Sequence, residues 1–419
     1  MKIAMFSDCY LDLTGGVVSS INAQKQELEK LGHTVYVFSP GFRRRKKVKQ
    51  QLARQKIFIV PSCKLLFRGL TPVSRRPRVV ERWLERNFPE LAEFTVFHIH
   101  YEGGCSIAGI RLGRKLGVSV VQTMHGREDM GEMGIIPWGL RTFVAVALNE
   151  FHSWYLPHSI MVKRDNYLAP NLARARMWNL MINHANQADL VLSPSQHFKR
   201  KLEQYGVKRR IEVLPNGVPD ELLKINRKIR RLKAGESLRI VWHSRVSAEK
   251  RIMPFLEALA MVQEGYRLEV FGEGGELMRA KNFVRAKNLK VFFHGDLPFK
   301  KILPMIAKCH LDVLVSDNTD TFGMTLIEAE ALGVPVMICD ADMKEIIPRG
   351  GYVISEDASV KAMAETIVDL IENPEKISKM SKVMLENRDE IRQSKRVREL
   401  VEIYQQVRIE TELEKRRRI

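Results

Sequence analysis

The sequence is poor in cysteine, and its cysteines are not arranged for a structural role. Only five occur in 419 residues, and no two of them stand in a C-x-x-C pair. This pattern disfavours a disulfide framework and a zinc site, and it is typical of reduced, mostly buried thiols in a cytosolic protein. We therefore expect no structural disulfide and no bound metal. The five residues are Cys9, Cys63, Cys105, Cys309 and Cys339.

Long apolar runs are also missing. No stretch approaches the roughly 18 uninterrupted apolar residues that a membrane-spanning helix needs. The first residues, Met1 to Asp8, lack the apolar region of a signal peptide and are predicted to form a first strand instead. We expect a cytoplasmic protein with two α/β domains of about 200 residues each, because one core rarely grows larger.

Acidic residues are scarce relative to basic ones, and the imbalance is local. The chain has 68 Lys and Arg against 49 Asp and Glu, a net charge of +19. The segment from Arg43 to Arg86 alone holds 15 basic residues and two acids, a net +13. Such a cluster indicates an anionic partner, which is an acidic membrane face, a nucleic acid or a polyanionic acceptor. Nucleic acid is disfavoured because the segment lacks regular aromatic stacking positions and no known nucleic-acid-binding module is present.

The basic segment contains the candidate membrane or acceptor contacts. The run Arg43–Lys47 is predicted to be a loop. Val79, Val80, Trp83, Leu84 and Phe88 fall on one helical face. That face packs on the core in one interpretation and lies in a lipid interface in the other. The predicted membrane or acceptor residues are Arg43, Arg44, Arg45, Lys46, Lys47, Arg75, Arg76 and Trp83.

The first half alternates strands, glycine-rich loops and helices, which predicts a doubly wound sheet. A strand at Lys2–Phe6 leads through Gly15 and Gly16 into a helix, and these glycines allow close approach to a phosphate. His125 follows the strand Val118–Thr123, at the carboxyl end where such sheets place site residues. His98 is predicted to be a core residue, whereas His100 could face the site. The segment from Gly131 to Asn179 is predicted to form one or two apolar helices, either for an acceptor or for plain packing.

The second half repeats this pattern. Its most informative stretch begins with the buried strand Leu311–Val315 and ends in a helix from about Met324 to Leu332, closed by Gly333. A helix start that follows a strand and a loop presents free N–H groups and a positive dipole end to an anion. Asp320 and Glu328 flank this point, although one more βαβ unit with surface acids is the alternative.

Two cations near the start of another helix suit a diphosphate. Arg245 supplies a forked donor and Lys250 a point charge, five positions apart. Solvated helix-start residues are the alternative, although cations there oppose the helix dipole. Glu328 suits a bidentate contact with a ribose diol. Together these residues describe a nucleotide-sugar site.

With these residues the chain resembles the retaining GT-B glycosyltransferases. This large family (glycosyltransferase family 4-like) includes sucrose and glycogen synthases and bacterial envelope mannosyl- and glucosyltransferases. The resemblance spans nearly the whole chain. It rests, in order, on Met1–Asp8 with Gly15-Gly16-Val17, His98-Ile99-His100, Thr123-Met124-His125, Pro215-Asn216-Gly217-Val218, Arg245 with Glu249-Lys250, and Asp320-Thr321-Phe322-Gly323 through Glu328-Ala329. The family's signature opens with glutamate where this chain has Asp320, which leaves the choice of sugar and the activity open.

The resemblance implies two doubly wound Rossmann-like domains facing each other across a cleft. The expected boundaries are 1–218 for an acceptor-binding domain, 219–236 for a linker, 237–390 for a donor-binding domain and 391–419 for a basic helix that can cross back to the first domain. The implied catalytic residues are His125, Arg245, Lys250 and Glu328. The implied donor-binding residues are Gly15, Gly16, Asn216, Gly217, Asp320, Thr321, Phe322, Gly323, Met324 and Thr325.

The resemblance further implies transfer of a hexose from a nucleoside diphosphate sugar as co-substrate, with retention and without a cofactor or metal. In detail the chain is similar to bacterial diacylglycerol glucosyltransferases. This similarity implies UDP-glucose as donor and a lipid acceptor at the inner, anionic face of the cell membrane. It also allows a homodimer. A non-catalytic partner subunit, a transferase for a soluble or polymer acceptor, and a GT-B isomerase or epimerase are the alternatives.

Overall fold

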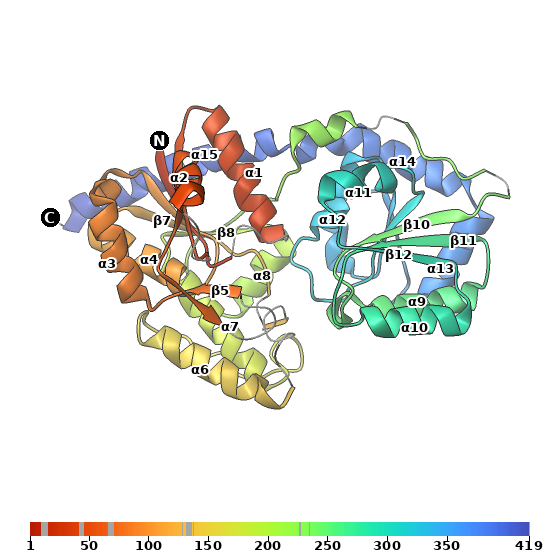
Figure 1. The fold of residues 1–419 in the computed structure, drawn as a ribbon, viewed down its shortest axis with the longest axis horizontal. Helices are drawn as coiled ribbons and strands as arrows, with labels where there is room; N and C mark the ends of the chain where they lie inside the picture. Colours follow the sequence, from red (N-terminus) through yellow and green to blue (C-terminus); the bar gives the residue numbers. More distant parts are fainter. Residues whose placement is uncertain are drawn as a thin grey trace. The chain divides into compact units, whose positions relative to one another are not determined.

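The computed structural model describes residues 1–9, 16–41, 46–65, 71–127, 129–130, 136, 138–225, 228–233 and 235–418. The chain forms two compact units (Figure 1). The first consists of Met1–Pro215 together with Arg396–Ile419, and the second of Asn216–Lys395. Each unit contains a parallel sheet, as the alternation of strands and helices predicts.

The first unit is built on a seven-stranded sheet in the order β3-β2-β1-β6-β7-β8-β9, with every neighbouring pair parallel. A separate antiparallel pair, β4 and β5, lies in the basic segment. The strands are β1 (Lys2–Phe6), β2 (Thr34–Ser39), β3 (Ile57–Ile59), β4 (Ser62–Leu65), β5 (Thr71–Ser74), β6 (Val96–Ile99), β7 (Ser119–Thr123), β8 (Leu190–Ser193) and β9 (Ile211–Val213). The helices are α1 (Gly16–Lys30), α2 (Lys46–Arg54), α3 (Pro77–Asn87), α4 (Gly104–Leu116), α6 (Arg141–Ser153), α7 (Leu172–Ala185), α8 (Gln196–Gln204) and α15 (Gln393–Arg418).

The C-terminal helix α15 covers one face of this sheet. Val397, Leu400, Tyr404 and Val407 are buried, and their spacing places them on one helical face. They belong to the same apolar cluster as Ile3, Met5, Val35 and Val37 of the first two strands. Residues 397–407 of α15 therefore complete the core of the first unit.

Asp8, just past β1, supplies a cap that α4 lacks. The N-cap residue of α4 is Gly103, which has no side chain to accept the first N–H groups. The Asp8 carboxylate accepts the N–H of Cys105 at 2.8 Å and that of Ser106 at 3.0 Å, and it also accepts the Ser74 hydroxyl at 2.7 Å. A side chain on Gly103 would come within 2.5 Å of the Asp8 carboxyl carbon, so the site requires glycine there.

We expect Asp8→Ala to destabilise the first unit by about 1 kcal/mol, the usual loss when a capping carboxylate is removed. Thermal unfolding followed by circular dichroism would show a lower midpoint. Asp389→Ala, which removes a surface aspartate that pairs with Arg392, serves as the control and should leave the midpoint unchanged. Equal midpoints for the Asp8 variant and the control would contradict the capping role.

The second unit is built on a six-stranded parallel sheet in the order β12-β11-β10-β13-β14-β15. The strands are β10 (Leu238–His243), β11 (Tyr266–Phe271), β12 (Val291–Gly295), β13 (Leu311–Leu314), β14 (Val336–Ile338) and β15 (Tyr352–Ile354). The helices are α9 (Ile252–Val262), α10 (Leu277–Lys287), α11 (Phe299–Ile306), α12 (Met324–Ala331), α13 (Val360–Glu372) and α14 (Glu375–Asn387). Buried apolar clusters cover both faces of the sheet.

One local prediction is wrong. The run Arg43–Lys47 was expected to be a loop, but Lys46 and Lys47 begin helix α2. Apart from Val48, the residues that follow in α2 are Lys, Gln, Leu, Ala and Arg, which are good helix formers, and their propensity outweighs the repulsion between neighbouring lysines. Arg43, Arg44 and Arg45 lie outside the described residues.

Candidate active site

The candidate donor site begins where β13 leads into α12. Gly323 precedes the helix with φ +71°, and a side chain there would come within 2.8 Å of Leu314. The first N–H groups of a helix have no partner within the helix, so they are available to an anion. The Thr325 hydroxyl, in the first turn, is buried and makes no hydrogen bond within the described structure. This helix start is therefore able to bind a phosphate.

Lys250 and Asp320 form an ion pair beside this helix start. The second oxygen of Asp320 accepts the Ser316 hydroxyl, and the side chains of Lys250 and Asp320 are each only 14% exposed. Burial by itself would raise the pKa of Asp320, but the charge and hydrogen bond of Lys250 and the Ser316 hydroxyl together lower it. Asp320 is thus an ionised carboxylate that fixes the position of the Lys250 ammonium.

Arg245 follows β10 and remains largely accessible. Its side chain is 58% exposed, and its Nη2 lies 3.2 Å from the Glu249 carboxylate. Glu249 also accepts the Ser247 hydroxyl at 2.7 Å. The guanidinium is oriented by one partner and keeps donors for a ligand, because it carries five N–H groups.

Two glycines after β11 let two loops of the site pack backbone to backbone. A side chain on Gly272 would meet the Ser244 carbonyl oxygen at 2.3 Å, and one on Gly274 would meet the Val246 carbonyl oxygen at 2.3 Å. The Val246 N–H donates to the Glu273 carbonyl at 3.0 Å. These glycines were not among the predicted site residues, although the sequence Gly-Glu-Gly-Gly after a strand is a signal for close backbone approach.

Glu328 lies in α12 beside two further titratable groups. His243 Nε2 is 2.7 Å from Asp312 Oδ2, and its Nδ1 is 3.9 Å from Glu328 Oε2. Burial raises the pKa of Glu328 to about 8 and lowers that of His243 to about 4. Burial, followed by the charge of Glu328, raises the pKa of Asp312 well above its usual range. Neither His243 nor Asp312 was predicted, although a carboxylate within an apolar strand is a recognisable signal.

In the first unit, His125 lies two residues past β7 and contacts His100. His125 Nε2 is 2.9 Å from His100 Nδ1. Burial lowers the pKa of His125 to about 4, so the ring is neutral at pH 7 and can act as a hydrogen-bond donor or acceptor.

His98 is fully buried, between the Thr123 hydroxyl at 2.7 Å and the Tyr404 hydroxyl at 2.6 Å, which confirms its predicted core role. His100 is also buried, and its Nε2 makes no hydrogen bond within the described structure.

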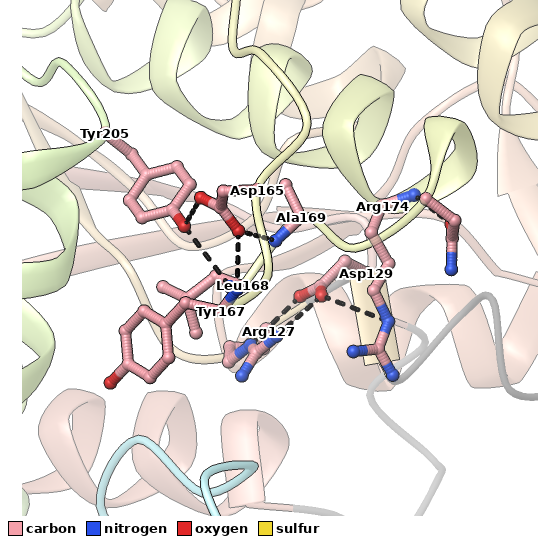
Figure 2. Close-up of polar contacts among 9 residues, drawn as sticks. Arg127, Asp129, Asp165, Tyr167, Leu168, Ala169, Arg174 and Tyr205 are labelled. Carbon is pink, nitrogen blue, oxygen red and sulfur yellow. Dashed lines mark hydrogen bonds and ion pairs between the residues drawn. The ribbon is translucent and has the colours of Figure 1, made fainter.

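The segment after His125 is held by a buried ion pair. Figure 2 shows Arg127 and Arg174 pointing at the Asp129 carboxylate. Arg127 binds it in a bidentate manner at 2.7 and 3.1 Å, and Arg174 lies 3.9 Å away. The Arg127 guanidinium also lies 5.7 Å from the centre of the Trp178 ring. This cluster fixes the backbone that follows His125, because breaking a buried pair leaves an uncompensated charge.

Figure 2 also shows a polar turn that is built around Asp165. Asp165 accepts the N–H groups of Tyr167 and Ala169 at 2.9 Å and the hydroxyl of Tyr205. The centres of the Tyr205 and Trp178 rings lie 4.7 Å apart. Tyr205 contacts the turn and Trp178 contacts Arg127, so this buried aromatic pair links the turn to the Arg127–Asp129 ion pair.

The other predicted donor residues lie at helix starts or in packed loops. Gly217 packs on the first residue of α15, where a side chain would come within 2.7 Å of the Gln393 Cα. Asn216 is half-buried beside it. Gly16 begins α1, whereas Gly15 lies outside the described residues. Phe322 and Thr321 are buried in the loop before α12, and Phe322 belongs to the apolar core.

The predicted membrane residues are divided between surface and core. Arg75 and Arg76 are exposed at the start of α3. Trp83 is half-buried and packs on Phe88, with ring centres 5.6 Å apart, while Val80 and Leu84 are fully buried. The packing of this face favours the core interpretation over the lipid one. The side chains of Lys46 and Lys47 lie outside the described part of the structure.

In the second of the two Rossmann-like parallel sheets, the start of α12 and the cations beside it suit a phosphate. Two such sheets define a protein of the GT-B class. Solved structures share this fold. HepE of Anabaena, solved in complex with UDP, is 15% identical with a TM-score of 0.69, and the match covers 97% of this chain and all of HepE. Sucrose-phosphate synthase of Thermosynechococcus elongatus is 16% identical with a TM-score of 0.65, covering 97% of this chain and 98% of the enzyme.

The chain belongs to glycosyltransferase family 4, a retaining family whose donors are nucleotide sugars. The model of Glycosyltransferase Family 4 matches residues 14–222, and that of Glycosyl transferases group 1 matches residues 224–386. The alpha-monoglucosyldiacylglycerol synthase of Acholeplasma laidlawii is 23% identical over 91% of both chains. The enzyme of the same name from Streptococcus pneumoniae is 24% identical, over 80% of this chain and 70% of that enzyme.

Proposed function

We propose that this glycosyltransferase moves glucose from UDP-glucose to a diacylglycerol-type lipid at the inner, anionic face of the cell membrane. Two relatives carry the name alpha-monoglucosyldiacylglycerol synthase, and HepE was also solved in complex with UDP-glucose. The observation that carries the donor half of the proposal is the convergence of Lys250, Asp320 and the start of α12 at one point of the second unit.

In this proposal the protein stabilises the charge of the leaving diphosphate. Arg245, Lys250 and the N–H groups at the start of α12 supply positive charge without a metal, and Glu328 binds the ribose hydroxyls. The acceptor hydroxyl attacks on the face of the leaving group, and a phosphate oxygen of the donor takes its proton. The neutral His125 ring forms a hydrogen bond to the donor sugar.

An exposed apolar surface supports the membrane half of the proposal. Six of the fourteen large apolar side chains exposed in the described structure lie within residues 140–172. Phe143 and Trp154, at the two ends of α6, and Met161 are the most exposed of these six, at 72–74%. We use the name α6 surface for these six exposed side chains, which lie close together in the sequence and are Leu140, Phe143, Trp154, Met161, Tyr167 and Leu172.

The charge near the α6 surface suits an anionic bilayer. Residues 138–176 contain five lysines and arginines and two acids, and Lys163 and Arg164 are exposed beside Met161. Apolar side chains bordered by cations are typical of a segment that lies in a lipid interface. Within the described residues, no helix is both long and apolar enough to cross a bilayer. The attachment that we propose is peripheral and uses the α6 surface.

A donor screen followed by product analysis tests the function. We expect UDP-glucose to raise the thermal unfolding midpoint more than GDP- or ADP-linked sugars, because a ligand that binds only the folded state stabilises it. Incubation with UDP-glucose and diacylglycerol in anionic vesicles should then yield an α-linked glucolipid. Stabilisation without turnover would favour a non-catalytic partner subunit, and transfer only to soluble or polymer acceptors would contradict the lipid assignment.

A further inference from the structure

Two histidines at neighbouring strand ends of the first unit form a hydrogen bond with each other. His100 directly follows β6, and His125 lies two residues past β7, the next strand in the sheet. Nδ1 of His100 is 2.9 Å from Nε2 of His125, and the two rings are nearly parallel, with an angle of 21° between their planes. At this distance one of the two nitrogens carries the proton and the other accepts it.

This hydrogen bond couples the tautomers of the two rings. Burial lowers the pKa of both histidines, so at pH 7 each neutral ring has one N–H group and one bare nitrogen. If His100 donates from Nδ1, then Nε2 of His125 is bare and His125 carries its proton on Nδ1. If His125 donates from Nε2 instead, His100 carries its proton on Nε2. Nδ1 of His125 is therefore a donor in the first arrangement and an acceptor in the second.

The surroundings of His100 favour the first arrangement. The residue is 1% exposed, and its Nε2 makes no hydrogen bond within the described structure. A proton on this nitrogen would be a buried N–H group without an acceptor, which is rarer in proteins than an acceptor without a donor. A proton on Nδ1 of His100, in contrast, has the bare Nε2 of His125 as its acceptor.

A third histidine holds the His100 ring in place. His98 packs on it, with ring centres 3.9 Å apart. Both nitrogens of His98 have partners, since Nε2 is 2.7 Å from the Thr123 hydroxyl and Nδ1 is 2.6 Å from the Tyr404 hydroxyl of α15. His98 therefore offers no acceptor to Nε2 of His100, and its packing fixes the plane of the His100 ring.

We propose that His100 fixes the tautomer of His125, so that His125 presents an N–H group at Nδ1 to a hydroxyl oxygen of the donor sugar. The inference rests on the proposed function, in which the His125 ring forms a hydrogen bond to that sugar. Nε2 of His125 is engaged with His100, so the sugar contact uses Nδ1. His100 is a positioning residue, because it acts on the sugar only through His125.

Nuclear magnetic resonance of the protein without ligand tests the tautomer directly. Protein labelled at the histidine ring nitrogens gives different signals for protonated and bare nitrogens, and His125→Gln identifies the signals of His125. We expect His125 of the wild type to be protonated at Nδ1. His100→Leu removes the donor and should give a mixture of both tautomers of His125. His100→Asn retains an N–H group at the position of Nδ1 and should restore the wild-type pattern.

The sugar contact is tested by comparing UDP with UDP-glucose in calorimetry. UDP lacks the sugar, so its affinity should be equal in wild type and His100→Leu. The affinity for UDP-glucose should fall about tenfold in His100→Leu, an effect of the size expected for one lost hydrogen bond, and should recover in His100→Asn. A loss of packing alone would weaken the binding of both ligands alike.

His33→Leu is the matched control. His33 directly precedes β2, at the opposite end of the sheet from His125, and its Nδ1 is 3.0 Å from the amino group of Met1. This variant should match the wild type in the tautomer of His125 and in both affinities.

Three results would overturn the inference while leaving the donor site intact. They are a proton on Nε2 of His125 in the wild type, an unchanged tautomer in His100→Leu, and an equal loss of affinity for UDP and UDP-glucose in that variant. A folded wild-type protein that binds no UDP-glucose would instead overturn the proposed function and the sugar contact with it, whatever tautomer the spectrum shows.

Discussion

Replacement of Lys250 by alanine is expected to lower kcat for sugar transfer about 100- to 1000-fold. This is the usual effect of removing one preorganised donor that stabilises charge in the transition state. The Lys250 side chain is only 14% exposed, lies beside the start of α12 and is held there by Asp320. Its ammonium is therefore positioned before the diphosphate leaves. Arg245→Ala should give a loss of the same kind, since its accessible guanidinium serves the same charge. Steady-state kinetics with UDP-glucose measure both.

Stability needs a separate control, because Lys250→Ala leaves Asp320 as a buried carboxylate without its cation. Breaking a buried pair is destabilising, whereas removing both charges is much less so. The double variant Lys250→Ala with Asp320→Asn should unfold at nearly the wild-type temperature and still fail to transfer sugar. Lys376→Ala, which breaks the surface pair with Asp369, should retain normal activity. Near-normal turnover by the folded double variant would eliminate Lys250 from the donor site.

Binding to anionic vesicles should fall roughly 30-fold when both Phe143 and Trp154 are replaced by serine. The two side chains are more than 70% exposed, so their removal costs the folded protein little. Each would bury apolar area in the lipid interface, and losing about 2 kcal/mol in total corresponds to this change in partitioning. Flotation with vesicles that contain acidic lipid, at low and high salt, measures it.

The second unit provides a matched control for this experiment. Met278 is an equally exposed apolar side chain in α10, outside the α6 surface, and Met278→Ser should not change vesicle binding. Replacing Lys163 and Arg164 together should weaken binding mainly at low salt, because each cation near an anionic surface contributes about 1 kcal/mol before screening. Wild-type binding by the Phe143 and Trp154 double variant would rule out the α6 surface as the membrane contact.

Much of the fold followed from local pattern. Buried parallel strands appear as short apolar runs, and Gly117 and Gly333 mark helix ends because they adopt the left-handed conformation that other residues avoid. The break at Pro374 between α13 and α14 followed for a similar reason, since proline cannot continue a helix. The start of α2 at Lys46 was not predicted, because a run of like charges is typical of a loop but can also begin a helix of straight-chain residues.

The site was less predictable than the fold. Arg245, Lys250, Asp320 and Glu328 were recognised by residue type and spacing. The ion pair of Lys250 with Asp320, 70 positions apart, was not, and neither was the contact of His243 with Asp312, 69 positions apart. The departure from the family signature at Asp320 acquires a physical role here, because this side chain holds the lysine.

The sequence by itself determined the alternation of strands and helices, the glycines where backbones must approach closely, and the kinds of side chain at the strand ends. Only the tertiary structure decided which of those side chains meet, such as Tyr404 with His98 across 306 positions. It also decided that the apolar face of α3 is packed while the ends of α6 are exposed. Periodicity depends on neighbours along the chain, whereas ion pairs, hydrogen bonds and burial depend on the register and packing of distant segments.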